Sequence, residues 1–186
     1  MGQKDTYDEA LIVEQLHHQE TVNAAFGKVI EHYSQPLYWQ IRRRVIDHDD
    51  ANDVLQNTFI KAWSNIGSFR GDAKFSTWLY KIAVNESITF INKKKVQNNI
   101  SLDDDSSFLT CNLEADRYFD GDEAQLKLQK AIATLPDKQR LVFNMRYYDE
   151  MKYEDMSEIL GTSVGALKAS YHHAVKKIES FFGEED

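Results

Sequence analysis

Aromatic and cationic side chains are concentrated between positions 59 and 95, and this combination suits the binding of an unpaired nucleic-acid strand. Exposed bases stack on aromatic rings, each contributing about 1–3 kcal/mol, while cations follow the phosphate backbone. We expect most of the rings to lie in a core, because large aromatic side chains are mainly buried. The rings are Phe59, Trp63, Phe69, Phe75, Trp78, Tyr80 and Phe90, and the interleaved cations are Lys61, Arg70, Lys74 and Lys81.

A basic helix near the end of the chain has the residue types needed to read duplex DNA. If Val164, Leu167 and Tyr171 face inward, small residues and lysines share the outward face, where they would approach base edges and phosphates. An ordinary amphipathic helix with a solvated basic face has the same pattern, so spacing alone leaves both interpretations open. The outward face consists of Gly165, Ala166, Lys168, Ala169, His172 and Lys176.

A polar flank is expected on the helix that contains residues 50–63. Asp53, Gln56, Asn57 and Ile60 recur at helical spacing on one side, and Leu55, Phe59 and Ala62 recur on another. A polar flank of this kind is either solvated or docks on another protein.

Catalytic and metal-binding chemistry is not indicated. The pairs His17-His18 and His172-His173 point to different sides of a helix, and no further ligands lie at metal spacing. Cys111 lacks a partnered histidine, and the chain has no glycine-rich phosphate loop. We therefore expect a protein that is not an enzyme and that needs no cofactor or metal.

The elements that would position these residues are predicted to be helices. Apolar residues recur every three or four positions, whereas no long segment alternates with period two. The predicted fold class is all-α, with two small helical domains joined by an acidic linker and a helix-turn-helix at the end of the second. Pro36 is expected to bend or break the first long helix, and His48-Asp49-Asp50 to form a turn and N-cap. Helices are then predicted at about 54–66, 74–93, 128–135, 137–148, 153–160 and 164–178.

Charge supports the same division of the chain. The formal net charge of −8 argues against a nucleic-acid partner when it is taken as a whole. Residues 23–95 nevertheless carry +4 and residues 126–182 carry +2, whereas residues 1–22 carry −4 and residues 96–125 carry −7. We predict an acidic N-terminal extension (1–22), a first domain (23–95), an acidic linker (96–125) and a second domain (126–182). The absence of a signal peptide and of a long apolar run predicts a cytoplasmic protein without membrane insertion.

Two motifs resemble conserved regions of the extracytoplasmic-function (ECF) sigma factors of the sigma-70 family. Residues 50–63, followed by Phe69-Arg70-Gly71 and residues 75–85, resemble the second conserved region. Residues 135–140 and 153–168 resemble the fourth. The resemblance implies a bacterial transcription initiation factor that binds core RNA polymerase and promoter DNA, and that an anti-sigma factor holds until release.

The resemblance also implies a role for each candidate face. One set of residues would bind core polymerase, a second would capture the melted minus-ten element, and a third would read the minus-thirty-five duplex. The sets are Asp50, Asp53, Gln56, Asn57 and Ile60 for polymerase; Arg70, Lys74, Trp78, Lys81 and Asn85 for the minus-ten element; and Ser163, Gly165, Ala166, Lys168, Ala169, His172 and Lys176 for the minus-thirty-five element.

The sequence departs from the family at two positions. Many relatives have arginine where this chain has Ser170 and His173, so we expect fewer phosphate contacts to the upstream element. Two other functions remain open from the sequence: a stand-alone helix-turn-helix regulator that binds duplex DNA, and a helical adaptor that sequesters other proteins.

Overall fold

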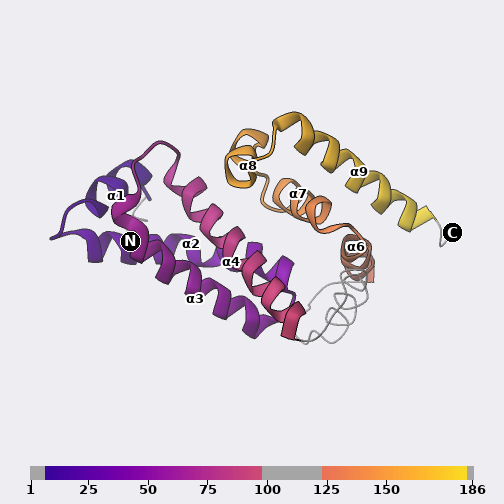
Figure 1. Cartoon of the computed structure of the whole chain (residues 1–186), viewed down its shortest axis with the longest axis horizontal. Coiled ribbons are helices and arrows are strands. Elements are labelled where there is room, and N and C mark those ends of the chain that lie inside the picture. The colour runs from indigo at the N-terminus through magenta and orange to yellow at the C-terminus, as the bar shows by residue number, and fades with distance from the viewer. Residues whose placement is uncertain (1–6, 98–122, 184–186) are drawn as a thin grey trace, which may run out of the picture.

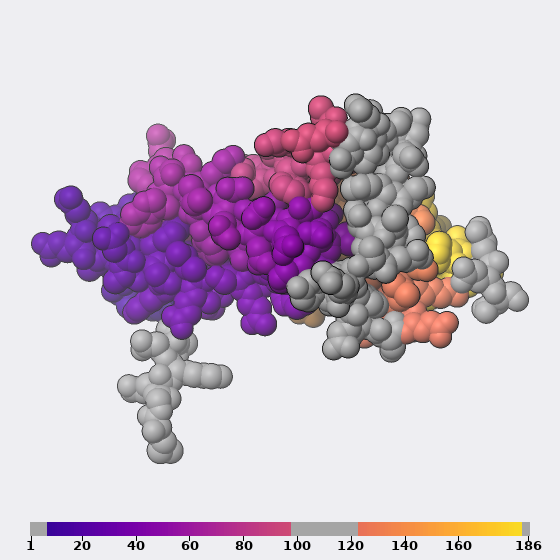
Figure 2. All heavy atoms as spheres, turned by 90° about the horizontal axis from the view of Figure 1, so that it is seen from below, coloured from indigo at the N-terminus to yellow at the C-terminus, as the bar shows by residue number. Residues whose placement is uncertain are grey.

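The computed structural model describes residues 7–97 and 123–183, which form two helical blocks and contain no strand. The all-α prediction is therefore confirmed. The two blocks lie side by side in Figure 1 and succeed one another along the longest axis in Figure 2. Most of the acidic linker, with Cys111, lies outside the described residues. The N-terminal block contains α1 (Glu9–Leu16), α2 (Val22–Val45), α3 (His48–Asn65), a 3-10 turn (Ile66–Ser68) and α4 (Phe75–Gln97); the C-terminal block contains α6 (Glu123–Ala133), α7 (Asp137–Tyr147), α8 (Tyr153–Leu160) and α9 (Val164–Gly183).

Helices α2, α3 and α4 enclose the core of the N-terminal block. Most of the predicted aromatic side chains contribute to this core, because Phe59, Phe69 and Phe75 are buried and Trp78 packs against their cluster. The rings of Phe69, Phe75 and Trp78 lie 5.3–5.4 Å apart between centroids, at tilted or edge angles. Aromatic pairs favour such angles over parallel stacking. The loop that precedes α4 is therefore anchored at both of its ends by rings.

One predicted helix boundary is wrong, and at Pro36 the helix does not break. Helix α2 runs through Pro36 without a break. Pro36 and His32 are exposed residues, and a proline inside a helix leaves the backbone carbonyl four positions earlier without its helical partner. The N-cap of α3 is Asp47 rather than a residue of His48-Asp49-Asp50, and its carboxylate accepts a hydrogen bond from the backbone N–H of Asp50 at 2.9 Å.

Helix α1 lies within the segment that the sequence marks only as acidic. Asp8 caps this helix by accepting hydrogen bonds from the backbone N–H groups of Ala10 and Leu11. Ile12 and Leu16, one turn apart, are buried in the core of the N-terminal block. Residues from Asp8 onward thus pack as part of this block.

Glu9 connects three helices of the N-terminal block. Its carboxylate accepts a hydrogen bond from the hydroxyl of Tyr33 in α2 at 2.8 Å, and a second from the backbone N–H of Phe75 at the start of α4 at 3.1 Å. A carboxylate at a helix N-terminus also interacts favourably with the helix dipole. Glu9 therefore fixes the point at which the loop after Phe69 becomes helix α4.

Replacing Glu9 with alanine should lower the free energy of unfolding by about 1.5–3 kcal/mol, because both hydrogen bonds to a charged acceptor are lost. Chemical denaturation of the full chain measures this change. Glu14→Ala, which removes an exposed carboxylate from the same helix, is the matched control and should change stability by less than about 0.5 kcal/mol. Equal stability of Glu9→Ala and Glu14→Ala would contradict the assigned role.

The C-terminal block contains the predicted helix-turn-helix. Helix α8 ends at Gly161, whose φ of 62° lies in the left-handed region that glycine adopts without strain. After Thr162, the hydroxyl of Ser163 accepts a hydrogen bond from the backbone N–H of Ala166 at 3.3 Å, so Ser163 caps α9. Leu167 is buried between the two helices. None of the helices in residues 7–97 and 123–183 is long and apolar enough to cross a membrane.

Candidate nucleic-acid and protein interfaces

The polar flank of α3 forms an exposed surface. Asp53, Gln56, Asn57 and Ile60 all lie on the outside of the N-terminal block, while Val54, Thr58 and Phe59 fill its core. Ile60 is 62% exposed, and Trp63 one turn later is 41% exposed. Asp50, the fifth predicted member, differs because it is half-buried and pairs with Lys94 of α4. An apolar side chain ringed by polar groups is typical of a protein-docking surface.

The second candidate face is a stripe along α4. Trp78, Lys81 and Asn85 follow one another at helical spacing, with Lys81 and Asn85 exposed and Trp78 half-buried against the aromatic cluster. Arg70 is exposed in the loop before α4. Lys74, by contrast, contacts the C-terminal block. Its ammonium lies 3.6 Å from a carboxylate oxygen of Asp155 in α8.

The third candidate face covers the outside of α9, and all seven of its predicted residues are exposed. The ammonium of Lys168 lies 5.7 Å from the centre of the Tyr153 ring, which holds this cation beside the start of α8. Of the two departures from the family pattern, His173 is exposed whereas Ser170 is half-buried. A long side chain at His173 would therefore reach solvent more readily than one at Ser170.

The two blocks pack directly on each other, mainly through α4 and α8. Val84 of α4 is buried in one cluster with Met156 and Ile159 of α8, and the rings of Tyr80 and Tyr153 flank this cluster. Burial of apolar side chains across the two blocks stabilises their contact. The face of α4 that meets α8 adjoins the stripe of Trp78, Lys81 and Asn85.

Charged residues surround the apolar contact between the blocks. Arg43 of α2 donates a hydrogen bond to the carboxylate of Asp149 and stacks on the Tyr148 ring at 4.8 Å. Lys95 and Asp137 form a further ion pair between the blocks at 3.4 Å. Burial raises the pKa of the Asp149 carboxyl above its ordinary value, and the neighbouring arginines oppose this rise. Burial, with Asp149 nearby, also raises the pKa of Tyr80 to about 12.

Sequence reasoning missed the residues that connect these elements. The helix that carries Glu9 could have been predicted from the sequence, since Asp8 precedes Ile12 and Leu16 at the spacing of a capped amphipathic helix. The contact of Arg43 with Asp149 has none, because residues 106 positions apart meet only when the blocks pack.

Family comparisons match both blocks. Residues 29–96 match the model of Sigma-70 region 2, and residues 125–178 match that of Sigma-70, region 4. The chain is 33% identical over 156 residues to the ECF RNA polymerase sigma factor SigW of Bacillus subtilis, covering 80% of this chain and 83% of the relative. It is 30% identical to the ECF RNA polymerase sigma-E factor of Haemophilus influenzae, covering 87% and 89% respectively.

Solved structures share the fold at lower sequence identity. CnrH, solved in complex with the cytosolic domain of CnrY, superposes with a TM-score of 0.70 at 20% identity, covering 96% of this chain and 99% of that one. The sigma factor RpoE of Bartonella quintana, solved with the anti-sigma factor NepR, gives a TM-score of 0.65 at 20% identity, covering 85% and 96%.

Proposed function

Because the chain belongs to the ECF sigma factors of the sigma-70 family, which direct core RNA polymerase in transcription initiation, we propose that its three exposed faces divide the work of promoter recognition. The flank of Asp53, Gln56, Asn57 and Ile60 binds core polymerase. The exposed apolar side chain of Ile60 within polar surroundings is the observation that supports this assignment most directly. Asp50 supports the flank through its pair with Lys94.

The stripe on α4 captures the melted minus-ten element. Trp78 offers a partly exposed ring for stacking, and Lys81, Asn85 and Arg70 offer polar contacts to a strand passing alongside. Holding an unstacked base is cheapest once the duplex is open, so this face contributes to opening rather than to duplex binding. Lys74 joins the face after its pair with Asp155 breaks.

The outer face of α9 reads the minus-thirty-five element in duplex form. Gly165, Ala166 and Ala169 let the start of the helix approach base edges closely. Lys168, His172 and Lys176 lie beside them and reach toward phosphates. Ser163 caps the helix, and its hydroxyl also lies at the exposed N-terminal end. The boundaries of the two domains, 23–95 and 126–182, stay predictions.

Run-off transcription with purified core polymerase tests the whole assignment. We expect promoter-dependent transcripts only when the folded protein is present. A folded protein that supports no transcript on any ECF-type promoter would contradict the assignment. Footprinting on free duplex DNA is the companion experiment, because a stand-alone regulator would protect its site without polymerase whereas this protein should protect it weakly or not at all.

An anti-sigma factor is the proposed regulatory partner, with the cytoplasm as the proposed location. RpoE of Bartonella quintana, which is similar in fold, was solved with such a factor. Affinity purification from the native cell should recover core polymerase subunits together with this partner.

Restoring a cation at His173 should strengthen binding to the upstream element. His173→Arg adds one exposed charge on α9, so the magnitude of the slope of log affinity against log salt should rise by about one. Titration of holoenzyme with upstream duplex at several salt concentrations measures this slope. Glu158→Gln, which removes an exposed negative charge on α8, is a control for a general change in net charge, and an equal rise in its slope would contradict a specific contact.

A further inference from the structure

Two histidines stand next to each other on the outside of α9, the helix proposed to read the upstream duplex. His172 and His173 are both exposed, and the centroids of their rings lie 6.1 Å apart. His172 belongs to the reading face, whereas His173 has no role in the proposed function. An imidazole differs from a lysine in that its charge changes between about pH 5 and pH 8. The pair therefore gives the outside of α9 a charge that depends on pH.

Lysines surround both imidazoles. Consecutive helical residues are about 100° apart, so the two rings face different sides of α9. His172 stands one turn from Lys168 and one turn from Lys176, which share its face. His173 borders an open groove of about 630 Å³ together with Lys176 and Lys177. The other described residues that line this groove are uncharged: Thr134, Gln139, Ser180 and Phe181.

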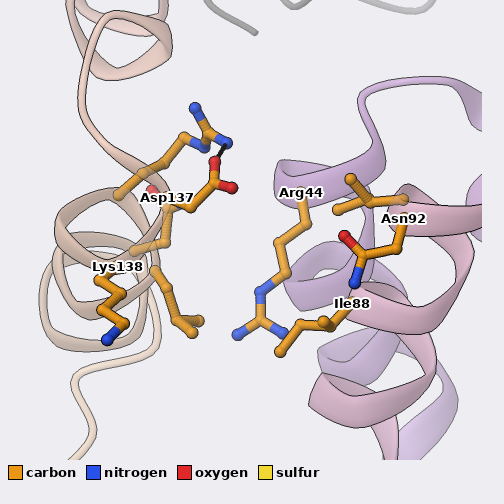
Figure 3. A pocket seen from close by; sticks show the side chains of 9 residues that line it. Arg44, Ile88, Asn92, Asp137 and Lys138 are labelled. Carbon is orange, nitrogen blue, oxygen red and sulfur yellow. Dashed lines mark hydrogen bonds and ion pairs between the residues drawn. The ribbon is translucent and has the colours of Figure 1, made fainter. Parts of the chain in front are cut away.

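The helices packed on α9 place no carboxylate within ion-pair distance of either imidazole in the part of the chain that the structure describes. In α7, Asp137 and Lys138 line the cavity between the two blocks, where Asp137 is bonded to Arg140 (Figure 3). Asp155 of α8 is paired with Lys74. No described carboxylate thus competes with a ligand anion for a protonated ring. The remaining ionisable groups of these helices are Glu123, Lys127 and Lys130 of α6; Arg146 and Tyr147 of α7, with Tyr148 after it; Tyr153, Glu154 and Glu158 of α8; and Tyr171 and Glu179 of α9 itself.

We propose that protonation of His172 and His173 strengthens the binding of upstream duplex DNA by α9. A protonated ring donates a charge-assisted hydrogen bond to a phosphate oxygen, whereas a neutral ring adds no charge to the contact. The major groove runs between two phosphate strands, so rings on different sides of a helix in that groove can each meet a phosphate. The inference rests on the proposed function of α9 and specifies how pH regulates it.

DNA binding and protonation favour each other by thermodynamic linkage. Because the protonated protein binds DNA more tightly, DNA binding takes up protons, and the affinity rises as the pH falls. Each ring that becomes charged also adds a phosphate contact that releases counterions. The magnitude of the slope of log affinity against log salt should therefore rise by about one for each charged ring. The lysines of α9 keep their charge throughout this pH range, so they contribute equally at both ends of it.

Titration of holoenzyme with a labelled upstream duplex at about pH 6 and about pH 8, each at several salt concentrations, tests the proposal. The duplex is taken from a promoter that the holoenzyme transcribes. We expect the affinity of the parent to rise by about fivefold or more toward the lower pH, as charge-assisted hydrogen bonds form. The magnitude of the salt slope should rise by about one to two over the same range.

His172→Gln with His173→Gln keeps two hydrogen-bonding side chains that cannot ionise. This double variant should bind within about twofold of the parent at the higher pH, and it should lose the difference between the two pH values that the parent shows beyond the background of polymerase itself. His17→Gln with His18→Gln is the matched control, because it changes another adjacent pair of exposed histidines, at the end of α1 in the other block. The control should keep the full pH dependence. Denaturation midpoints at both pH values verify that the variants fold.

Three results would overturn the proposal: the same pH dependence in the parent and in the α9 double variant, a salt slope of the parent that does not change with pH, or an equal loss of pH dependence in the α1 control. If the parent binds upstream duplex equally well at both pH values, this inference fails while the proposed role of α9 stands. If holoenzyme binds the upstream duplex at neither pH, both are contradicted. The two failures are therefore distinguishable.

Discussion

Replacing Asp53 with arginine should weaken binding to core RNA polymerase by about 10- to 100-fold, because like charges brought together at an interface cost several kcal/mol. Asp53 lies on the exposed flank of α3, in line with Gln56, Asn57 and Ile60. Its carboxylate has no ion-pair partner among the described residues, so the substitution breaks no such contact within the chain. Fluorescence titration with purified core enzyme measures the affinity.

Glu179→Arg is the control for Asp53→Arg. It makes the same change of charge at an exposed position of α9, in the other block. We expect the control to bind core enzyme within about twofold of the parent chain. The denaturation midpoints of both variants should match the parent, which separates loss of binding from loss of folding. An Asp53→Arg protein that binds normally would remove α3 from the polymerase interface.

The double substitution of Lys81 and Asn85 with alanine should reduce promoter opening by about tenfold or more. These two exposed side chains follow Trp78 along α4, and hydrogen bonds from them to an unpaired strand are each worth about 0.5–1.5 kcal/mol, or more where a charge takes part. Binding to the closed duplex should change less than opening. Permanganate reactivity of promoter thymines measures opening, and gel retardation at low temperature measures closed binding.

Asn23→Ala with Lys28→Ala is a matched control for that double substitution. It removes the same two side-chain types from exposed positions on α2. Opening and closed binding should both stay near the parent values. Equal loss at both steps in the α4 variant would argue against capture of a single strand by this stripe.

Local signals predicted the C-terminal block more closely than the N-terminal one. Gly161 and Ser163 each define a helix end through their own backbone or side chain, and α8 begins and ends where the sequence places it. The N-cap of α3 was misplaced by one residue or more because Asp47, Asp49 and Asp50 are all suitable caps. At Pro36 the sequence allows a bend or a break, and the structure excludes the break: Tyr33 and Leu37, on either side of the proline, are buried in one core along a continuous α2.

Contacts between distant residues could not be predicted from spacing. Arg43 and Arg44 stand in a run of three arginines to which the sequence assigns no role, yet Arg43 is bonded to Asp149 and Arg44 is buried. The packing of α2 against α7 and the residues that follow it determines both environments. In the candidate interfaces, exposure follows the helical period, so positions such as Asp53 and Lys81 lie outside as predicted. The partners of Asp50 and Lys74 depend instead on tertiary contacts.

The contact between the two blocks limits how far apart they can act on one DNA molecule. Duplex DNA advances 3.4 Å per base pair, so promoter elements about 25 base pairs apart are separated by roughly 85 Å. While α8 rests on α4, the stripe on α4 and the outer face of α9 are held at one fixed separation. The chain from Gln97 to Glu123 has a contour length of at most about 90 Å. This length limits how far the ends of α4 and α6 can move apart when the two blocks separate.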